Sequence, residues 1–359
     1  MAFTLRLRGG KSNYPYAVAR VQAKRAKLIP PRDYEKILKM DVSEITRFIE
    51  DSAYKAEVDE LGARFSGLDL LEAALTVNEE RTYASVRRML EGPGGALIEL
   101  FLARHLVNDL KTLFRGKNAG ASREDLLKEL LLEDLDTYGM FQPLLSEDVR
   151  TFDDIVQALL RQSGVAADWG RILSRVPEGS GLNVYEDVLD KAYYGRLLDS
   201  LVTSRQKGSD QFLKFTRHEI DARNLVNAAR WVTAGQGGDF TPYIIPGGLR
   251  FKVGDVVALA RAPDMDAFAE ALQDSEVLEG IRDGLAQTRA TGRLVPLETA
   301  VRRRLMDELG RLSHQHPLSI VPILLFLIQK DREVRVLRAV ARGKAAGLSE
   351  ERLRELVTV

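Results

Sequence analysis

The sequence contains no cysteine among its 359 residues. Disulfide bonds, thiolate nucleophiles and sulfur-ligated metal sites are therefore excluded, and nothing in the composition indicates an oxidising compartment. A net charge is also absent, since Lys+Arg and Asp+Glu each number 52. Without an overall positive charge the chain has no long-range attraction for phosphate groups, and we expect no nucleic-acid partner and no binding to an anionic bilayer surface.

Long hydrophobic runs are missing as well. The longest, residues 318–328, contains Pro322 and is far shorter than the roughly 20 apolar residues that span a bilayer. It predicts a buried core helix instead. The first 13 residues include no apolar stretch of signal-peptide length, and the pair Gly9-Gly10 indicates that folded structure begins after it. We expect residues 1–13 to form a flexible tail.

Signatures of enzymes, cofactor sites and metal sites are also missing. The glycine-rich stretches 92–95 and 235–239 lack the spacing and the preceding strand of a phosphate-binding loop. His218-Glu219 begins like a zinc-protease motif, but Ala222 stands where the second histidine is required. The pair Asp153-Asp154 suits a helix start, and the four histidines form no convincing ligand set. The sequence predicts no catalytic residue, cofactor or metal.

What the sequence does contain is helical periodicity. Apolar residues recur at spacings of three and four, as in Leu106, Leu110 and Leu113, and alternation typical of strands is confined to short pieces. With 45% hydrophobic and 29% charged residues, the chain has the composition of a globular protein large enough for two or three domains. These observations predict an all-α protein.

A long internal repeat is the most informative pattern. A leucine, an arginine five residues later and a glycine five residues after that occur three times, with the arginines 115 and 112 residues apart. Glutamates near the starts of helical segments recur with nearly the same period, 114 and 112 residues. A fixed period at two places in the unit predicts one domain-sized helical unit used three times. The sets are Leu110, Arg115, Gly120; Leu225, Arg230, Gly235; Leu337, Arg342, Gly347; and Glu72, Glu186, Glu298.

Each unit is predicted to contain a first helix beginning near its glutamate, a turn, and a longer helix ending at its arginine and glycine. New helices are expected after Ser122 and Ser349, and a further helix follows at residues 154–173 and 255–272. The last unit ends before such a helix, and residues 43–61 have a similar apolar pattern. If they complete the last unit, the three units close into a ring or funnel, whereas an open solenoid would leave spare ends.

The recurring arginines and glycines have two interpretations. A helix commonly ends with a left-handed glycine, and a cation in its last turns interacts favourably with the helix dipole. Alternatively, equivalent polar residues line a shared surface at which a partner docks, and the charge-dense segments 217–223 and 330–335 face the same cavity. On this second interpretation the predicted partner-binding residues are Arg115, Arg230, Arg342, Glu219, Glu333 and Arg335.

Several segments resemble one family, the C subunit of archaeal and V-type rotary ATPases, which includes the eukaryotic d subunit. They are NYPYAVARV at 13–21, DARNLVNAARW at 221–231, IIPGG at 244–248 and DREVRVLRAVARGKAAG at 331–347. The resemblance implies three similar helical domains with pseudo-threefold symmetry forming a funnel, and no catalytic residues. It also implies a central-stalk role, with the shaft of the catalytic head on one side and the membrane proteolipid ring on the other.

From this resemblance we expect one copy per complex, located peripherally at the cytoplasmic face of the cell membrane, in a machine that links proton or sodium transport to ATP synthesis or hydrolysis. The expected domains are residues 14–130, 131–245 and 246–359, the last completed by the N-terminal helices. Two alternatives stay open at this point. One is a general helical scaffold or adaptor unrelated to energy conversion, and the other is a helical enzyme that acts on a small molecule.

Overall fold

The computed structural model describes residues 12–130, 139–204, 208–272 and 276–358. Every regular element in these ranges is a helix, and none of their residues forms a strand. The all-α prediction is confirmed. The predicted tail lies outside the described residues apart from Ser12 and Asn13.

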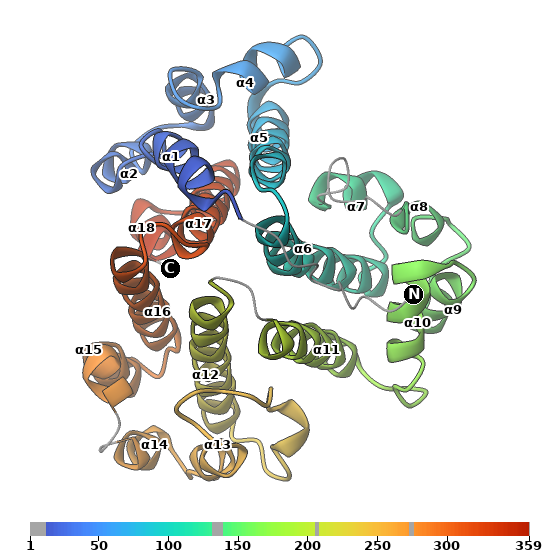
Figure 1. Cartoon of the computed structure of the whole chain (residues 1–359), viewed down its shortest axis with the longest axis vertical. Helices are drawn as coiled ribbons and strands as arrows, with labels where there is room; N and C mark the ends of the chain where they lie inside the picture. Colours follow the sequence, from blue (N-terminus) through green and yellow to red (C-terminus); the bar gives the residue numbers. More distant parts are fainter. Residues whose placement is uncertain (1–11, 131–138, 205–207, 273–275, 359) are drawn as a thin grey trace.

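Within these ranges, six long helices surround the middle of the molecule (Figure 1). They form three consecutive pairs, and each pair consists of a helix carrying a repeat glutamate and a helix carrying a repeat arginine, as predicted. Contacts also link neighbouring pairs, between α6 and α11, α12 and α16, and α17 and α5. The bounds are α5 Gly67–Met89, α6 Pro93–Asn118, α11 Leu182–Thr203, α12 Ser209–Thr233, α16 Val295–Gln315 and α17 Val321–Ala345.

Shorter helices lie mainly around these six (Figure 1). Four precede α5: α1 Tyr14–Arg25, α2 Pro31–Ile37, α3 Val42–Glu50 and α4 Lys55–Leu61. Between α6 and α11 lie α7 Arg123–Glu129, α8 Phe141–Leu144, α9 Phe152–Leu160 and α10 Gly164–Leu173. Between α12 and α16 lie the 3-10 turn η1 Thr241–Tyr243, α13 Val253–Ala260, α14 Met265–Ala271 and α15 Glu276–Thr291, and α18 Glu350–Thr358 follows α17.

The predicted single helices at 43–61, 154–173 and 255–272 are wrong, because each is two short helices. Gly164 has a φ of 63°, which stops the helix that would otherwise continue from α9. The Asp264 side chain accepts hydrogen bonds from the backbone N–H groups of Asp266 and Ala267, so it starts α14 afresh. The apolar residues keep their helical spacing across such breaks. The spacing alone therefore does not show that local residues end one helix and begin another.

Three of these short helices begin in the same way. The N–H of the residue before the helix donates to a carboxylate three residues later, from Asp41 to Glu44 (2.9 Å), Thr151 to Asp154 (2.8 Å) and Lys252 to Asp255 (2.8 Å). A carboxylate in the first turn also interacts favourably with the helix dipole. The predicted helix after Ser122 begins likewise, with the Ser122 N–H donating to the Asp125 carboxylate (3.3 Å).

The repeat glycines end helices, as the capping interpretation predicts. Gly120, Gly235 and Gly347 have φ values of 72°, 59° and 71°, a region that favours glycine. The next residue in each case donates its N–H to a carbonyl five residues earlier, from Ala121 (2.8 Å), Gln236 (3.2 Å) and Leu348 (2.8 Å). These are Schellman endings, which satisfy carbonyl groups that the helix leaves without partners.

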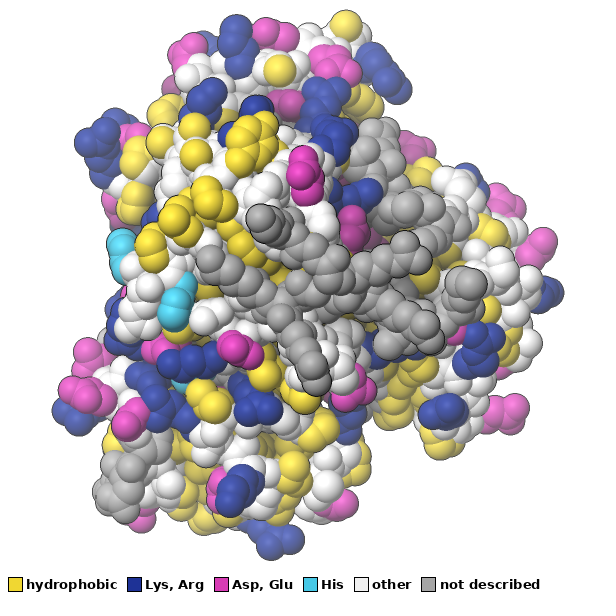
Figure 2. Space-filling view, viewed as in Figure 1, with side chains coloured by type: hydrophobic (Ala, Val, Ile, Leu, Met, Phe, Trp, Pro, Cys, Tyr) yellow, Lys and Arg dark blue, Asp and Glu magenta, His cyan; other side chains and the backbone are white. Residues whose placement is uncertain are grey.

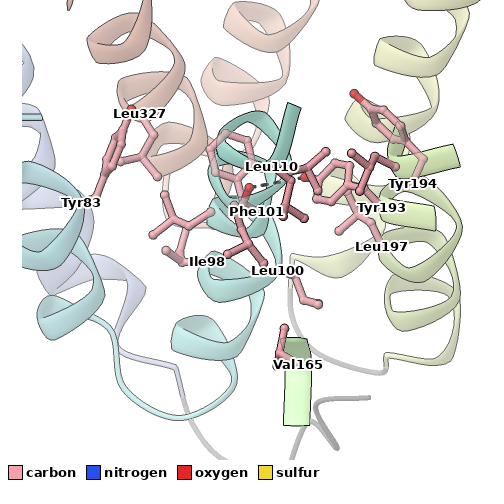
Figure 3. Close-up of a cluster of buried hydrophobic side chains, with 14 of the residues drawn as sticks. Tyr83, Ile98, Leu100, Phe101, Leu110, Val165, Tyr193, Tyr194, Leu197 and Leu327 are labelled. Carbon is pink, nitrogen blue, oxygen red and sulfur yellow. Dashed lines mark hydrogen bonds between the residues drawn. The ribbon is translucent and has the colours of Figure 1, made fainter. Parts of the chain in front are cut away.

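The main hydrophobic core is built around α6 (Figure 3). Ile98 lies on the side of Tyr83 and Leu327, whereas Phe101 lies toward Tyr193 of α11, whose hydroxyl donates to the Phe101 carbonyl. Within the predicted core helix at residues 318–328, residues 320–327 are buried as expected, but Leu318 is 55% exposed and lies in the turn before α17, which begins at Val321. Each fully buried large apolar side chain contributes about 1.5–3 kcal/mol. In the described part of the chain, no helix has both the length and the apolar character needed to cross a membrane.

A separate hydrophobic cluster joins the two ends of the chain. Residues of α2 to α5, such as Ile45 and Leu71, pack with Leu337 of α17 and Leu353 of α18. Nearby, buried Glu333 accepts hydrogen bonds from the Ile29 N–H (2.5 Å), the Tyr54 hydroxyl (2.7 Å) and Lys330 (3.1 Å). The N-terminal helices are therefore fastened to the second half of α17.

Candidate functional site

A cavity of about 460 Å³ lies among α6, α12, α16 and α17. Its wall is rich in charge, with arginines contributed by all four helices and carboxylates by α12, α16 and α17. Apolar side chains such as Phe215 and Ile328 fill the gaps between them. The charged and histidine residues of the wall are Arg104, His105, Glu219, Arg223, Arg230, Glu298, Arg302, Asp331, Arg332 and Arg335.

The cavity is distant from the turns that join the long helices. On α12 the nearest lining residue to its start at Ser209 is Phe215, and on α6, which starts at Pro93, it is Arg104. At a rise of about 1.5 Å per residue, these residues lie roughly 9 and 16 Å along their helices. The cavity and the helix turns therefore occupy different levels of the molecule.

Ion pairs fix much of the cavity wall. Arg104 donates from both terminal nitrogens to Glu219, at 3.2 and 3.1 Å, and stacks over the Phe101 ring at 3.9 Å. Arg230 pairs with Glu298 at 2.7 Å, and Arg335 with Asp331 at 2.8 Å. Guanidinium groups held in this way are fixed in direction, which suits selective binding of a partner with complementary charge.

Behind the wall lies a buried polar cluster. The His105 ring packs against Tyr83 at a tilt of 34° with centroids 4.6 Å apart, and the Tyr83 hydroxyl donates to Glu79 at 2.7 Å. Burial lowers the pKa of His105 to about 4, so its ring is neutral near pH 7. Burial, together with the charge of Asp331, raises the pKa of Glu79 to about 8. Neither group therefore adds charge to the cavity at neutral pH.

The six predicted partner-binding residues lie in three different settings. Glu219, Arg230 and Arg335 line the cavity. Arg115 and Arg342 are not among its lining residues, and Glu333 is buried in the cluster that joins the chain ends. The cavity residues that sequence reasoning missed include Arg104 and Arg302. Their only sequence signal is their place on helices that carry the repeat.

The two sets of repeat residues bind each other. Arg115 pairs with Glu186 at 2.6 Å and Arg230 with Glu298 at 2.7 Å, so each arginine reaches the glutamate of the following unit. Arg342 donates to Glu72 near the start of α5, and also to Glu129 at 2.6 Å. The arginines and the glutamates recur in the sequence with nearly the same period. Each arginine is therefore separated from the next repeat glutamate by a nearly constant number of residues, as a contact repeated between them would require, and this was the sequence signal for the pairing.

Residues 221–231 and 244–248, two of the segments that carry the resemblance, are in contact. Asp221 is buried on α12 and accepts hydrogen bonds from the N–H groups of Leu249 (3.0 Å), Arg250 (2.9 Å) and Phe251 (3.3 Å). Asn224 donates to the Ile245 carbonyl at 2.8 Å and accepts from its N–H at 2.9 Å. One turn of α12 thus holds the glycine-containing loop in place.

Comparison with known proteins identifies a family. The model of the ATP synthase (C/AC39) subunit family matches residues 17–356. The C subunit of the A-type ATP synthase of Methanosarcina mazei is 36% identical over 352 residues, which cover 98% of this chain and 94% of that protein. Proteins with the same name from Methanococcoides burtonii and Haloferax volcanii are 34% and 33% identical, over 99% and 95% of this chain and 97% and 96% of their own lengths.

Proposed function

Because this chain belongs to the ATP synthase (C/AC39) subunit family, we propose that it is the non-catalytic central-stalk subunit of a V/A-type rotary ATPase. In this role it couples the rotor shaft of the catalytic head to the membrane proteolipid ring, and torque passes through it during proton or sodium transport. The observation that carries the proposal is the family match over nearly the whole chain, together with a polar cavity enclosed by the long helices.

We further propose that the chain forms a funnel of three similar units with pseudo-threefold symmetry. Three features support it: the three pairs of long helices, their three Schellman endings, and the three Arg–Glu pairs that link successive units. The contact of α3 with α17 is the arrangement expected if the N-terminal helices complete the last unit. A closed array resists shear better than an open one whose units touch only neighbours.

The domain boundaries at residues 130 and 245 stay a prediction. Hydrophobic clusters are shared between adjacent predicted domains, and one of them extends from Leu225 to Val301. A coupling subunit whose cores cross between units transmits force without a flexible joint. We therefore propose that the three units rotate as one body.

The two levels of the molecule differ in chemistry. The cavity is polar, whereas Val202 and Leu318 at the helix turns are 61% and 55% exposed. Tyr16, 53% exposed, belongs to the same end, because Asn13 at the start of α1 donates to Met89 and accepts from the Glu91 N–H in the α5–α6 turn. Figure 2 shows hydrophobic side chains gathered over α1 on the viewed face. We propose that the cavity receives the shaft and that the turns face the ring.

Copurification with purified partners tests the proposal. The chain should bind both the shaft subunits and the detergent-solubilised proteolipid ring of the same organism, with one copy per complex, and in cells it should fractionate with the membrane and be reached from the cytoplasmic side. Failure to recover either partner would favour the alternative of a general helical scaffold. Turnover of a small molecule would favour the enzyme alternative.

A photo-crosslinking residue tests the orientation. At position 227, in the cavity wall, it should capture the shaft, and at position 318, in the α16–α17 turn, it should capture the ring. The reverse result would contradict the proposed orientation while leaving the coupling role intact. The two positions serve as controls for each other, because both variants carry the same added group.

A further inference from the structure

The cavity wall contains equivalent positions from all three units. The residue eleven positions before each repeat arginine lines the cavity, and so does the residue seven positions before it, on each of α6, α12 and α17. The first set is Arg104, Glu219 and Asp331, and the second set is Asn108, Arg223 and Arg335. This is the arrangement expected if the cavity lies on the proposed pseudo-threefold axis.

The chemistry at these positions is not threefold. The units of α12 and α17 each have a carboxylate in the first set and an arginine in the second. The unit of α6 instead has Arg104 and the neutral amide Asn108. A carboxylate in place of Arg104 would repel Glu219, whereas Arg104 donates to Glu219 from both terminal nitrogens, at 3.2 and 3.1 Å. One unit of the three therefore departs from the shared pattern at both positions.

The second set is the more accessible of the two. The side chains of Arg223 and Arg335 are 43% and 50% exposed, and Asn108 is exposed as well. The side chains of Arg104 and Glu219 are only 19% and 9% exposed. Both second-set arginines already lie beside a carboxylate, at 3.8 and 2.8 Å, so their guanidinium groups have defined directions. A molecule that enters the cavity thus meets two oriented guanidinium groups and one amide instead of three identical groups.

We propose that the departure of the α6 unit, Arg104 with Asn108, determines the rotational registry in which the shaft enters the cavity. The inference rests on the proposed coupling function and on the proposed three-unit arrangement, and it names residues that give the contact its specificity. Two sides of the shaft end would carry acceptors for Arg223 and Arg335, and the third an uncharged group facing Asn108. A shaft rotated by one third of a turn would place an acceptor opposite the amide and lose a charge-assisted hydrogen bond.

The Arg104–Glu219 pair keeps this difference in place. It joins α6 to α12 one helical turn from Asn108, about 6 Å along the helix. Arg104 is held further by its Nε, which donates to the Phe101 carbonyl at 3.2 Å, and by the Phe101 ring beneath it. The unit that departs from the pattern is therefore fixed to its neighbour at the level of the cavity.

Photo-crosslinking measures the registry. With the crosslinking residue at position 227 in the cavity wall and the purified shaft subunits as the probe, mass spectrometry should find one group of captured shaft residues. Asn108→Arg gives all three second-set positions an arginine, and a second, separate group should then appear. Asn108→Gln enlarges the side chain but keeps it neutral, and it should preserve the single group. A map that Asn108→Arg leaves unchanged would overturn the proposal.

Exchanging the charges of an ion pair provides a second test. Arg104→Glu combined with Glu219→Arg keeps opposite charges on α6 and α12 but interchanges their places, and it should weaken shaft binding in calorimetry by about tenfold or more. The same exchange at Arg115 and Glu186, a pair outside the cavity wall, should leave binding unchanged. Thermal unfolding of both double variants separates loss of binding from loss of fold. Unchanged affinity in a folded Arg104 and Glu219 exchange would also overturn the proposal.

The outcomes separate this inference from the coupling function. Shaft binding with a crosslink map and an affinity that ignore these variants would overturn the registry proposal and leave the coupling role standing. A wild-type map with separate groups of captured residues would show more than one registry and would likewise overturn the inference alone. A wild-type chain that binds no shaft would contradict the coupling role and the inference together.

Discussion

Glu79 is a buried carboxyl group whose pKa is raised by its surroundings. Its carboxyl group, only 3% exposed on α5, accepts from the Tyr83 hydroxyl and faces Asp331, Lys330 and Arg338 of α17. Burial raises its pKa from the ordinary 4.5 to about 8, with the charge of Asp331 acting in the same direction. The folded chain therefore keeps this proton up to a pH at which the unfolded chain has long lost it.

This difference predicts that stability falls as pH rises. The folded state binds more protons than the unfolded state between pH 4.5 and 8, so ionisation of Glu79 opposes folding in that window. His105 acts in the opposite direction, with a folded pKa of about 4 against the ordinary 6.5. Above pH 6.5 the Glu79 contribution outweighs that opposition, and stability should fall by about 1–2 kcal/mol to pH 8.

Urea unfolding at pH 6.5, 7.25 and 8 measures this slope. Glu79→Gln retains an oxygen that accepts from Tyr83 but cannot ionise, so the variant should lose the fall in stability. His105→Gln serves as the matched control and should retain the fall above pH 6.5. A wild-type stability that stays constant across this range would contradict the raised pKa of Glu79.

Asp221 supports a second prediction at the scale of one residue. Its three backbone hydrogen bonds hold residues 249–251, and Asp221→Ala would leave those N–H groups without a protein partner. We expect a loss of about 1–3 kcal/mol in urea unfolding and faster amide exchange in this loop. Asp239→Ala removes exposed contacts to Thr241 alone and should cost less. Equal costs would show that Asp221 does not organise the loop.

At the scale of elements, α6 and α17 each contain, besides the glycine at which the helix ends, a second glycine that leaves room for the next helix to pack. A side chain at Gly116 would meet Leu126 of α7, and one at Gly343 would meet Leu353 of α18. Each of these glycines directly follows a repeat arginine, Arg115 or Arg342. The second unit has Trp231 at the equivalent position, where no α7-like helix packs and the ring instead contacts Phe240 and Tyr243.

Replacing Gly343 by alanine should therefore push α18 away and lower stability by about 1–3 kcal/mol. Gly310→Ala is the matched control, because that glycine also lies inside a helix but has open space around it. Removing a helical glycine without a clash should stabilise the chain by about 0.4–1 kcal/mol. Thermal unfolding of both variants checks the two signs, and the same sign in both would contradict this account of α18 packing.

How much could be predicted from sequence also differs between elements. The Schellman endings and the helix start at Ser122 were predictable, because a few neighbouring residues determine them. The division of residues 154–173 was missed because Gly164 adopts a positive φ inside an otherwise continuous apolar pattern. Of the cavity arginines, Arg230 and Arg335 were predicted, whereas Arg104 and Arg302 could not be singled out, since an arginine facing a cavity and one facing solvent look alike in a charge-dense helix.

At the scale of the whole molecule, the three Arg–Glu pairs differ in what they connect. Two join neighbouring units, with partners 71 and 68 residues apart, whereas Arg342 reaches Glu72 across 270 residues. Only the last brings together the two ends of the helical array. Sequence periodicity predicts that the units are alike, but closure depends on a contact between the first predicted unit and the last, which a period alone leaves open.

The closing pair should also be the strongest. The side chains of Arg115 and Arg230 are 59% and 57% exposed and each pairs with one repeat glutamate, a geometry worth about 0.2–1 kcal/mol. Arg342 is 39% exposed and donates to both Glu72 and Glu129, so more of its charge is desolvated and each nitrogen has a fixed acceptor. Double-mutant cycles with alanine should give a larger coupling for Arg342 with Glu72 than for Arg115 with Glu186.

Amide exchange then shows whether this contact closes the molecule. Arg342→Ala should speed exchange in α3, α4 and the first turns of α5, which lie far from residue 342 in sequence. α3 and α5 pack against its helix, and α4 packs against α3 and α5. Arg115→Ala removes an equivalent guanidinium and should affect only α6 and α11, because its partner lies in the adjacent unit. If exchange in α3 and α4 is unchanged in Arg342→Ala, then the shared hydrophobic cluster and Glu333 hold the ends together without the ion pair.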